Sequence, residues 1–163
     1  MNKLLVIGDV HNRWVQAEEI ASKYDATHTI IFVGDYFDNF HDTALDADQT
    51  ARWLKKSLEK SNRIHLIGNH DINYAYYNIR NSGNRTAQLY HCSGYSPQKD
   101  DAINRIMTNE DWDKIKISHK ENGFWFSHGG FHPNWFGNFQ GMSDEVIEQK
   151  LKEIQICLES RSV

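Results

Sequence analysis

The sequence predicts an α/β domain built around a parallel sheet. Three short apolar runs, at residues 4–7, 29–33 and 64–67, each end at a glycine. Segments of helical periodicity separate these runs, and the order strand–helix–strand–helix–strand implies parallel strands joined by right-handed crossovers. Binding sites in such sheets form beyond the carboxyl ends of the strands. Polar residues follow each of the three glycines at those ends.

The composition is that of a soluble globular protein, and we expect residues 1–163 to form a single domain. Hydrophobic residues make up 39% of the chain and charged residues 25%. The net charge of -4 does not support charge-driven binding to nucleic acid. No apolar run approaches the roughly 18 residues that span a membrane, and the N-terminus is not a signal peptide. The two cysteines lack metal-type spacing, which favours a reduced, cytoplasmic setting.

The first half of the chain provides the clearest elements. The continuous apolar runs 4–7 and 29–33 are typical of strands buried on both faces. Apolar residues at helical spacing predict helices over residues 14–24 and 48–59, the second after a polar loop at 39–47. These helices are the crossovers between the three strands.

The second half is predicted to be less regular. Asn122-Gly123 lies between the strand-like runs 115–118 and 124–127, which is a strong hairpin signal. The second of these runs leads directly into His128. Capping residues and periodicity predict four further helices, over 72–79, over 97–107, from 110 after Thr108, and from 144 after Ser143.

Residues that bind divalent metal ions follow the three parallel strands and the hairpin. Asp9 and His11 are two residues apart on an extended turn, so both side chains can reach one ion. Asp35 follows the neighbouring strand and can bridge to a second ion. Asn69 and His128 offer that second ion an amide oxygen and a ring nitrogen. Two ions about 4 Å apart would activate a shared water and hold two phosphate oxygens.

His70 is the candidate proton donor for a departing alkoxide. It lies next to a candidate ligand, Asn69, without being one itself. Asp38 can hold the other ring nitrogen of His70 and keep the ring protonated, which is the usual role of a carboxylate behind a catalytic histidine.

Four motifs together resemble those of the calcineurin-like metallophosphoesterases. The resemblance implies a sandwich of two sheets between helices (αββα) and a dinuclear site for manganese, iron, zinc or nickel, with manganese favoured. It also implies that Asp9, His11, Asp35, Asn69 and His128 are ligands, that His70 is the acid and that Asp38 is its partner. The second and fourth motifs are most similar to the serine/threonine protein phosphatase branch and its phage and bacterial relatives. The motifs are Gly8-Asp9-Val10-His11, Gly34-Asp35-Tyr36-Phe37-Asp38, Gly68-Asn69-His70-Asp71 and Ser127-His128-Gly129-Gly130.

The chain departs from the pattern of that family in three places. The last family motif, a Gly-His-x-His-like segment that supplies a ligand, has no counterpart after His128. We therefore expect residues 1–163 to be the N-terminal portion of the family fold, incomplete at the C-terminus. Asn39 and Ile67 stand where related phosphatases carry arginines. The residues that bind phosphate consequently stay unidentified, and a phosphoprotein substrate is less favoured.

Each candidate also has a simpler structural interpretation. Asp9, Asp35 and Asn69 are residue types that favour turns after strands, and His128 can be an ordinary histidine at a strand end. The combined spacing with His11, His70 and Asp38 favours the metal site. The aromatic residues around 125–139 are more typical of packing than of a substrate pocket.

The favoured function is hydrolysis of a phosphomonoester, either a small molecule or a phosphoprotein, by a metal-activated water. One alternative is an inactive metallophosphoesterase-like module that binds metal weakly. Another is a fragment that needs a second chain for activity. The apolar stripe of the helix from residue 144 is predicted to pack in the core, but an exposed stripe would drive self-association or binding of a second chain.

Overall fold

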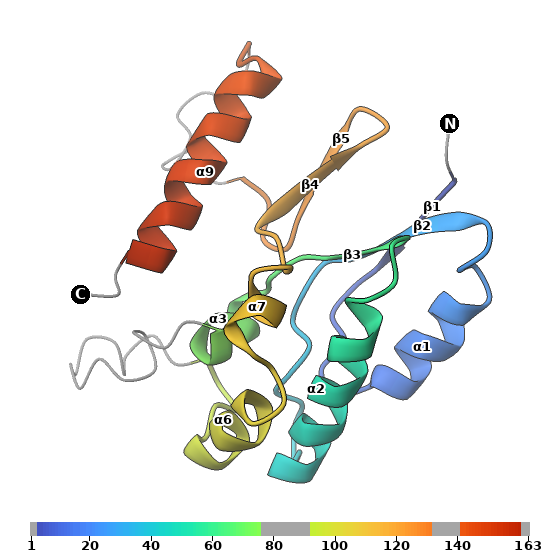
Figure 1. The fold of residues 1–163 in the computed structure, drawn as a ribbon, viewed down its shortest axis with the longest axis vertical. Helices are drawn as coiled ribbons and strands as arrows, with labels where there is room; N and C mark the ends of the chain where they lie inside the picture. The colour runs from blue at the N-terminus through green and yellow to red at the C-terminus, as the bar shows by residue number, and fades with distance from the viewer. Residues whose placement is uncertain (1–2, 76–91, 132–140, 161–163) are drawn as a thin grey trace.

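The computed structural model describes residues 3–75, 92–131 and 141–160 (Figure 1). Its helices and strands follow the order predicted from the sequence. They are β1 (Lys3–Ile7), α1 (Trp14–Ser22), β2 (His28–Phe32), α2 (Ala44–Ser57), β3 (Arg63–His65), α3 (Asn69–Ala75), α6 (Pro97–Asn104), α7 (Asn109–Trp112), β4 (Ser118–Glu121), β5 (Phe124–Ser127) and α9 (Asp144–Ser160).

A small parallel sheet in the order β1-β2-β3 forms the centre of the molecule. Ile7 pairs with Phe32, and Phe32 pairs with His65, so the three strands end at one edge. The connections through α1 and α2 are the predicted crossovers. The α/β class with a parallel sheet is thus confirmed, and the arrangement is consistent with a calcineurin-like fold.

Burial of the strands differs from the prediction for β1. Ile30, Ile31 and Phe32 of the central strand β2 are completely buried. Strand β1, in contrast, is mostly half-buried or exposed, and Val6 is 46% exposed. Leu5 and Ile7 pack against the core while the opposite face of β1 does not. The expectation of burial on both faces was therefore wrong for β1, because it is the outer strand of the described sheet.

Aromatic residues of the second motif anchor the main core between the sheet and the helices. Tyr36 and Phe37 are completely buried and lie in one cluster with Trp53 of α2 and Trp112 of α7. The Tyr36 hydroxyl lies 3.0 Å from Nδ1 of His65. Burial lowers the pKa of His65 to about 3, so this histidine is a neutral packing residue.

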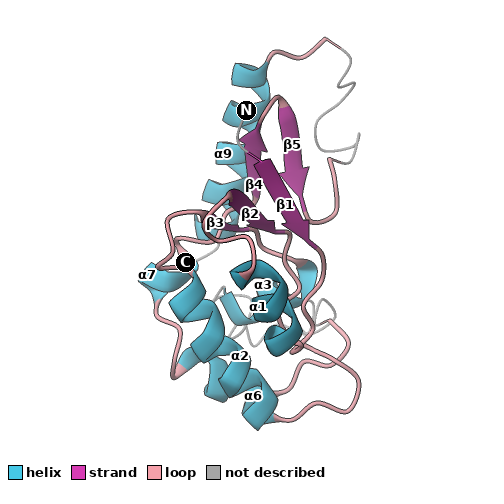
Figure 2. Cartoon of the chain, turned by 90° about the vertical axis from the view of Figure 1, so that its right-hand side faces the viewer, coloured by secondary structure: helices cyan, strands magenta, loops and turns pink. Residues whose placement is uncertain are grey.

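The hairpin β4–β5 and helix α9 form a second part of the fold beside β3 (Figure 2). The Lys116 backbone N–H donates to the His65 carbonyl, and the Lys116 carbonyl accepts from the Ile67 N–H, each at 2.9 Å. The strand therefore begins at Ser118 rather than at 115, because the preceding residues run parallel to the end of β3. The predicted Asn122-Gly123 turn is confirmed, with φ of 51° and 83°.

Helix α9 packs through its apolar side onto the hairpin. Ile147 and Leu151 are buried there, in contact with a cluster that includes Trp125 and Phe131. The predicted packing role of this stripe is confirmed for these two residues, although Val146 is 44% exposed. No helix in the described ranges is both long and apolar enough to cross a membrane.

Three helix boundaries differ from the sequence prediction by three or more residues, and α1 and α2 each end two residues earlier than predicted. Helix α2 begins at Ala44 rather than 48, because Thr43 and Asp46 form a capping box. Helix α3 begins at Asn69 rather than 72, and the predicted residues 76–79 lie outside the described ranges. Helix α6 ends at Asn104, three residues before the predicted end. The predicted Thr108 cap of α7 is present.

Candidate metal centre

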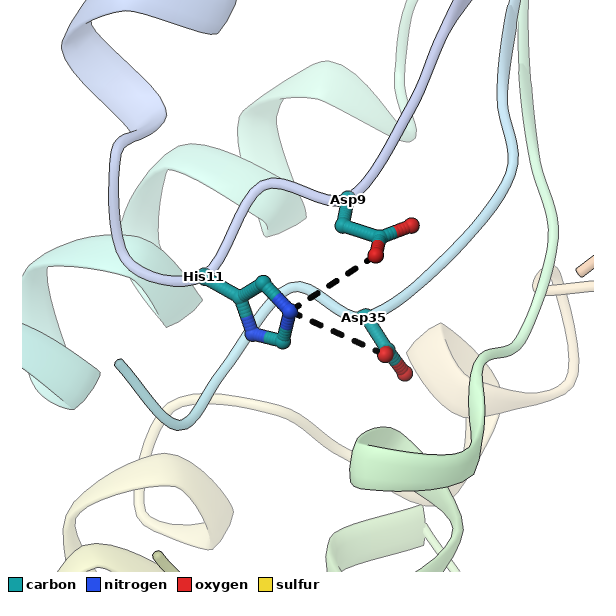
Figure 3. Close-up of side chains that lie close together, drawn as sticks. All are labelled: Asp9, His11 and Asp35. Carbon is teal, nitrogen blue, oxygen red and sulfur yellow. Dashed lines mark ion pairs between the residues drawn. The ribbon is translucent and has the colours of Figure 1, made fainter. Parts of the chain in front are cut away.

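Asp9, His11 and Asp35 converge where β1 and β2 end (Figure 3). Their candidate ligand atoms all lie within 4.8 Å of one another. Nε2 of His11 is 3.7 Å from Asp9 Oδ2 and 3.9 Å from Asp35 Oδ2. The first strand thus supplies two of these side chains and the second strand supplies the third. Carboxylate oxygens and an imidazole nitrogen form a donor set suited to a divalent first-row metal ion.

Backbone carbonyls orient both histidines of the centre. Nδ1 of His11 lies 2.9 Å from the Phe37 carbonyl, and Nδ1 of His128 lies 3.0 Å from the Val33 carbonyl. A carbonyl only accepts, so Nδ1 carries the hydrogen in each ring. Nε2 is then left with its lone pair when the ring is neutral, as in a metal-binding histidine held by an outer hydrogen bond.

His128 and Asn69 join the cluster on the other side of Asp35. Nε2 of His128 lies 2.9 Å from Asn69 Oδ1 and 3.3 Å from Asp35 Oδ2. The hydrogen bond to Asp35 raises the pKa of His128 to about 8, and in return His128 holds the pKa of Asp35 below its usual value despite burial. Asp35 therefore lies between His11 and His128, the position that a bridging carboxylate needs.

The cysteine Cys92 fixes the orientation of the Asn69 amide. Asn69 Nδ2 donates to Cys92 Sγ at 3.3 Å, and the thiol lies 3.1 Å from the Asn69 carbonyl. Because the amide nitrogen faces sulfur, the amide oxygen faces His128. The sequence offered no reason to connect Cys92 with the site.

The loops that carry these side chains are held in unusual backbone conformations. Positive φ angles occur at five non-glycine residues near the site, His11, Asn12, Asp35, Asp38 and His41, with values from 42° to 65°. Such angles are uncommon for residues with a Cβ, although Asn, Asp and His tolerate them best. Gly68 is required for a different reason, because a Cβ there would lie 2.1 Å from Asp35 Oδ1.

Asp71 clamps the second and third motifs together. Its completely buried carboxylate accepts three backbone N–H bonds, from Asp35, Tyr36 and Gly68, each at 2.8 Å. Burial raises the pKa of Asp71 to about 7, and the three donors oppose that shift. Asp71 is the last residue of the third motif, and its sequence position alone does not indicate this role.

His70 and Asp38 adopt the pairing expected of an acid and its partner. His70 Nδ1 lies 3.3 Å from Asp38 Oδ2, and the His70 backbone N–H donates to Asp35 Oδ1 at 2.9 Å. The His70 ring meets the His11 ring edge-on, with centroids 5.2 Å apart. His70, which belongs to the third motif, therefore lies beside the cluster of Asp9, His11 and Asp35.

A cavity of about 550 Å³ adjoins this histidine pair. His11, His70 and Asp38 form one part of its wall, and residues 39–42 and 93–99 contribute the remainder. The full lining is His11, Asp38, Asn39, Phe40, His41, Asp42, His70, Ser93, Gly94, Ser96 and Lys99. A comparable cavity between α1 and α2 contains none of the predicted site residues.

A family model described as calcineurin-like phosphoesterase matches residues 2–158. The chain belongs to the calcineurin-like phosphoesterase family. No curated protein and no solved structure gives a match.

Membership of the calcineurin-like phosphoesterases indicates metal-dependent hydrolysis of phosphoesters at a dinuclear metal site. The cluster of Asp9, His11 and Asp35 fits that requirement in donor chemistry, and the orientation of Nε2 in His11 fits it as well. The substrates of this family are phosphorylated compounds.

Proposed function

We propose that the chain is a phosphomonoesterase that uses two divalent metal ions, with manganese favoured. Asp9, His11 and Asp35 would hold one ion, and Asp35, Asn69 and His128 the other. The observation that supports this assignment best is the position of Asp35, whose Oδ2 lies 3.9 Å from His11 Nε2 and 3.3 Å from His128 Nε2. A carboxylate between two such nitrogens suits a bridging role.

The ions, when bound, supply Lewis acids for phosphate oxygens and activate a water as nucleophile. The ester P–O bond breaks as the water oxygen bonds to phosphorus, and the attacking water loses a proton to solvent. His70 gives its proton to the departing alkoxide and regains one from solvent. Asp38 orients the His70 ring through Nδ1. The leaving group would occupy the cavity lined by His70 and residues 39–42 and 93–99.

We further propose that the chain is a single domain related to the serine/threonine protein phosphatase branch and its phage and bacterial members. Gly34-Asp35-Tyr36 and His128-Gly129-Gly130 support this assignment. Both small phosphomonoesters and phosphoproteins are candidate substrates.

Hydrolysis of phenyl phosphate, an aryl ester whose leaving group benefits from protonation, tests the proposed activity with added Mn²⁺. Asp35→Asn removes a charge from the bridge and His70→Asn removes the acid, so we expect each to lower kcat by about 100-fold or more. Asp113→Asn changes an exposed carboxylate at the end of α7 and should retain full activity. Equal rates in wild type, D35N and H70N would contradict the assignment.

The alternative is a module of the same family that binds metal without catalysis, or one that needs a second chain for activity. The cluster recognised in the described residues has three ligand groups, and the side chain of Asp9 is 52% exposed. Calorimetric titration with Mn²⁺ separates the proposals. Tight binding of two Mn²⁺ ions favours the enzyme, whereas tight binding of one ion or none favours the inactive module.

A further inference from the structure

A buried lysine lies directly behind the candidate acid. Lys99 belongs to α6, outside the four motifs, and its side chain is 7% exposed. Its ammonium group lies between two carboxylates of the second-motif loop, Asp38 and Asp42. The side chain of Asp38 is completely buried, so its charge depends on neighbouring protein groups for stabilisation.

The hydrogen bonds of Lys99 argue against a role in binding phosphate. Its Nζ donates to Asp38 Oδ1 at 3.2 Å, to Gly94 O at 2.8 Å and to Asp42 Oδ1. An ammonium has three N–H donors, and these three acceptors use them all. Although Lys99 lines the cavity beside His70, its donors point to the protein.

The two oxygens of Asp38 have separate partners. Oδ1 accepts from Lys99 and from the Tyr74 hydroxyl, the latter at 2.7 Å. Oδ2 is directed to His70 Nδ1. Two fixed donors on Oδ1 set the rotation of the carboxylate, and that rotation places Oδ2 against the imidazole.

Lys99 also connects the acid to the first motif. Its partner Asp42 accepts from Asn12 Nδ2, next to the candidate ligand His11, and from the Asn39 backbone N–H at 3.1 Å. The lysine therefore neutralises repulsion between Asp38 and Asp42 and fixes the loop that carries both. Loss of the cation would leave two neighbouring buried carboxylates without their shared donor.

We propose that Lys99 is a positioning residue that holds Asp38, and through it His70, in the geometry for protonating the leaving group. The proposal rests on the proposed phosphomonoesterase function. A group that assists protonation matters most for an alkyl ester, because an alkoxide is a poor leaving group. A nitrophenyl ester needs little assistance, because nitrophenolate departs readily as an anion.

The test compares Lys99→Met with wild type on glycerol phosphate and on 4-nitrophenyl phosphate, both with Mn²⁺. We expect kcat for the alkyl ester to fall by about 10- to 100-fold and kcat for the nitrophenyl ester to change by less than about threefold. In the H70N background, K99M should cause no further loss on the alkyl ester, because residues that act through one group are not additive.

Lys55→Met is the matched control. Lys55 likewise bridges a buried carboxylate, Asp111, at 2.6 Å and a backbone carbonyl, that of Ile106, but it lies away from the cavity. K55M should affect both esters equally. If K99M does not fold, Tyr74→Phe removes the other donor to Asp38 Oδ1 and should give the same selective loss on the alkyl ester.

A second readout does not depend on turnover. In the metal-free protein, histidine ¹⁵N spectra report which ring nitrogen of neutral His70 carries the hydrogen. We expect Nδ1–H in wild type and K55M, and a loss of that preference in K99M or Y74F. Equal losses on both esters, additivity with H70N, or an unchanged His70 spectrum would each overturn the role of Lys99. Failure of wild type to hydrolyse either ester would instead contradict the proposed function.

Discussion

At the scale of single residues, Asp71 has the widest effect on the geometry of the site. Its carboxylate is the common acceptor for backbone groups of two loops. Asp71→Asn replaces one acceptor oxygen by a donor that faces N–H groups. We expect the free energy of unfolding to fall by about 2–4 kcal/mol, since buried donors lose their partner. The affinity for Mn²⁺ should fall too, because Asp35 loses its support. Urea unfolding and calorimetric titration measure the two effects.

Asp46→Asn provides the comparison for this prediction. Asp46 also accepts a backbone N–H, from Thr43, but it lies at the exposed start of α2. The expected loss is about 0.5–1 kcal/mol, with unchanged Mn²⁺ affinity. If D71N is no more destabilising than D46N, the bonds to Asp71 do not hold the two loops together.

Single residues differ in how far the sequence could predict them. The structure brings Asp9, His11 and Asp35 together, as their positions after neighbouring strands had suggested. Lys99 could not be found that way, because its contact with Asp38 joins segments 61 residues apart. Cys92 reaches Asn69 in the same long-range manner. Such contacts depend on tertiary packing and have no local pattern.

At the scale of elements, the hairpin β4–β5 depends on its turn to deliver His128. Gly123 has φ of 83°, and an added Cβ would meet nothing within 4 Å. Gly123→Ala should therefore cost only backbone strain, about 1–2 kcal/mol in unfolding free energy. Gly8→Ala, at a glycine with equal space and no positive φ, should change stability little. Thermal unfolding compares the two variants, and equal melting temperatures would contradict the assignment of strain to Gly123.

Element boundaries were predicted where a local signal was strong. Asn122-Gly123 and Thr108 marked a turn and a helix start correctly. The earlier start of α2 also had a local signal, Thr43 followed three residues later by Asp46, but the polar character of the segment favoured a loop. The later start of β4 had none, because it depends on pairing of Lys116 beside β3.

At the scale of the whole molecule, metal binding should stabilise the fold. An ion that binds only the folded state raises stability by mass action, and the side chains proposed to hold the ions come from four separate motifs. We expect Mn²⁺ to raise the melting temperature and a chelator to reverse the increase. D35N should abolish most of this shift. A melting temperature independent of Mn²⁺ in wild type would count against the metal centre.

The overall architecture followed from periodicity and glycine positions, since alternating strands and helices permit few topologies. Burial of the outer strand could not be predicted, because an apolar run such as 4–7 does not show whether a neighbour covers it. The relation of α9 to the hairpin likewise depends on contacts between Leu151 and distant residues such as Trp125.

The positive φ angles in the site loops restrict which mutations the loops can accept. His11, Asp35 and Asp38 occupy backbone conformations that β-branched and bulky side chains enter only with strain. Asn, Asp and His are among the few residue types that tolerate such conformations, and Asp and His are also good metal ligands. The turn and the ligand are therefore not competing explanations of these residues. A substitution at His11 or Asp35 must therefore suit the backbone conformation as well as the proposed metal binding, and few residue types meet both requirements.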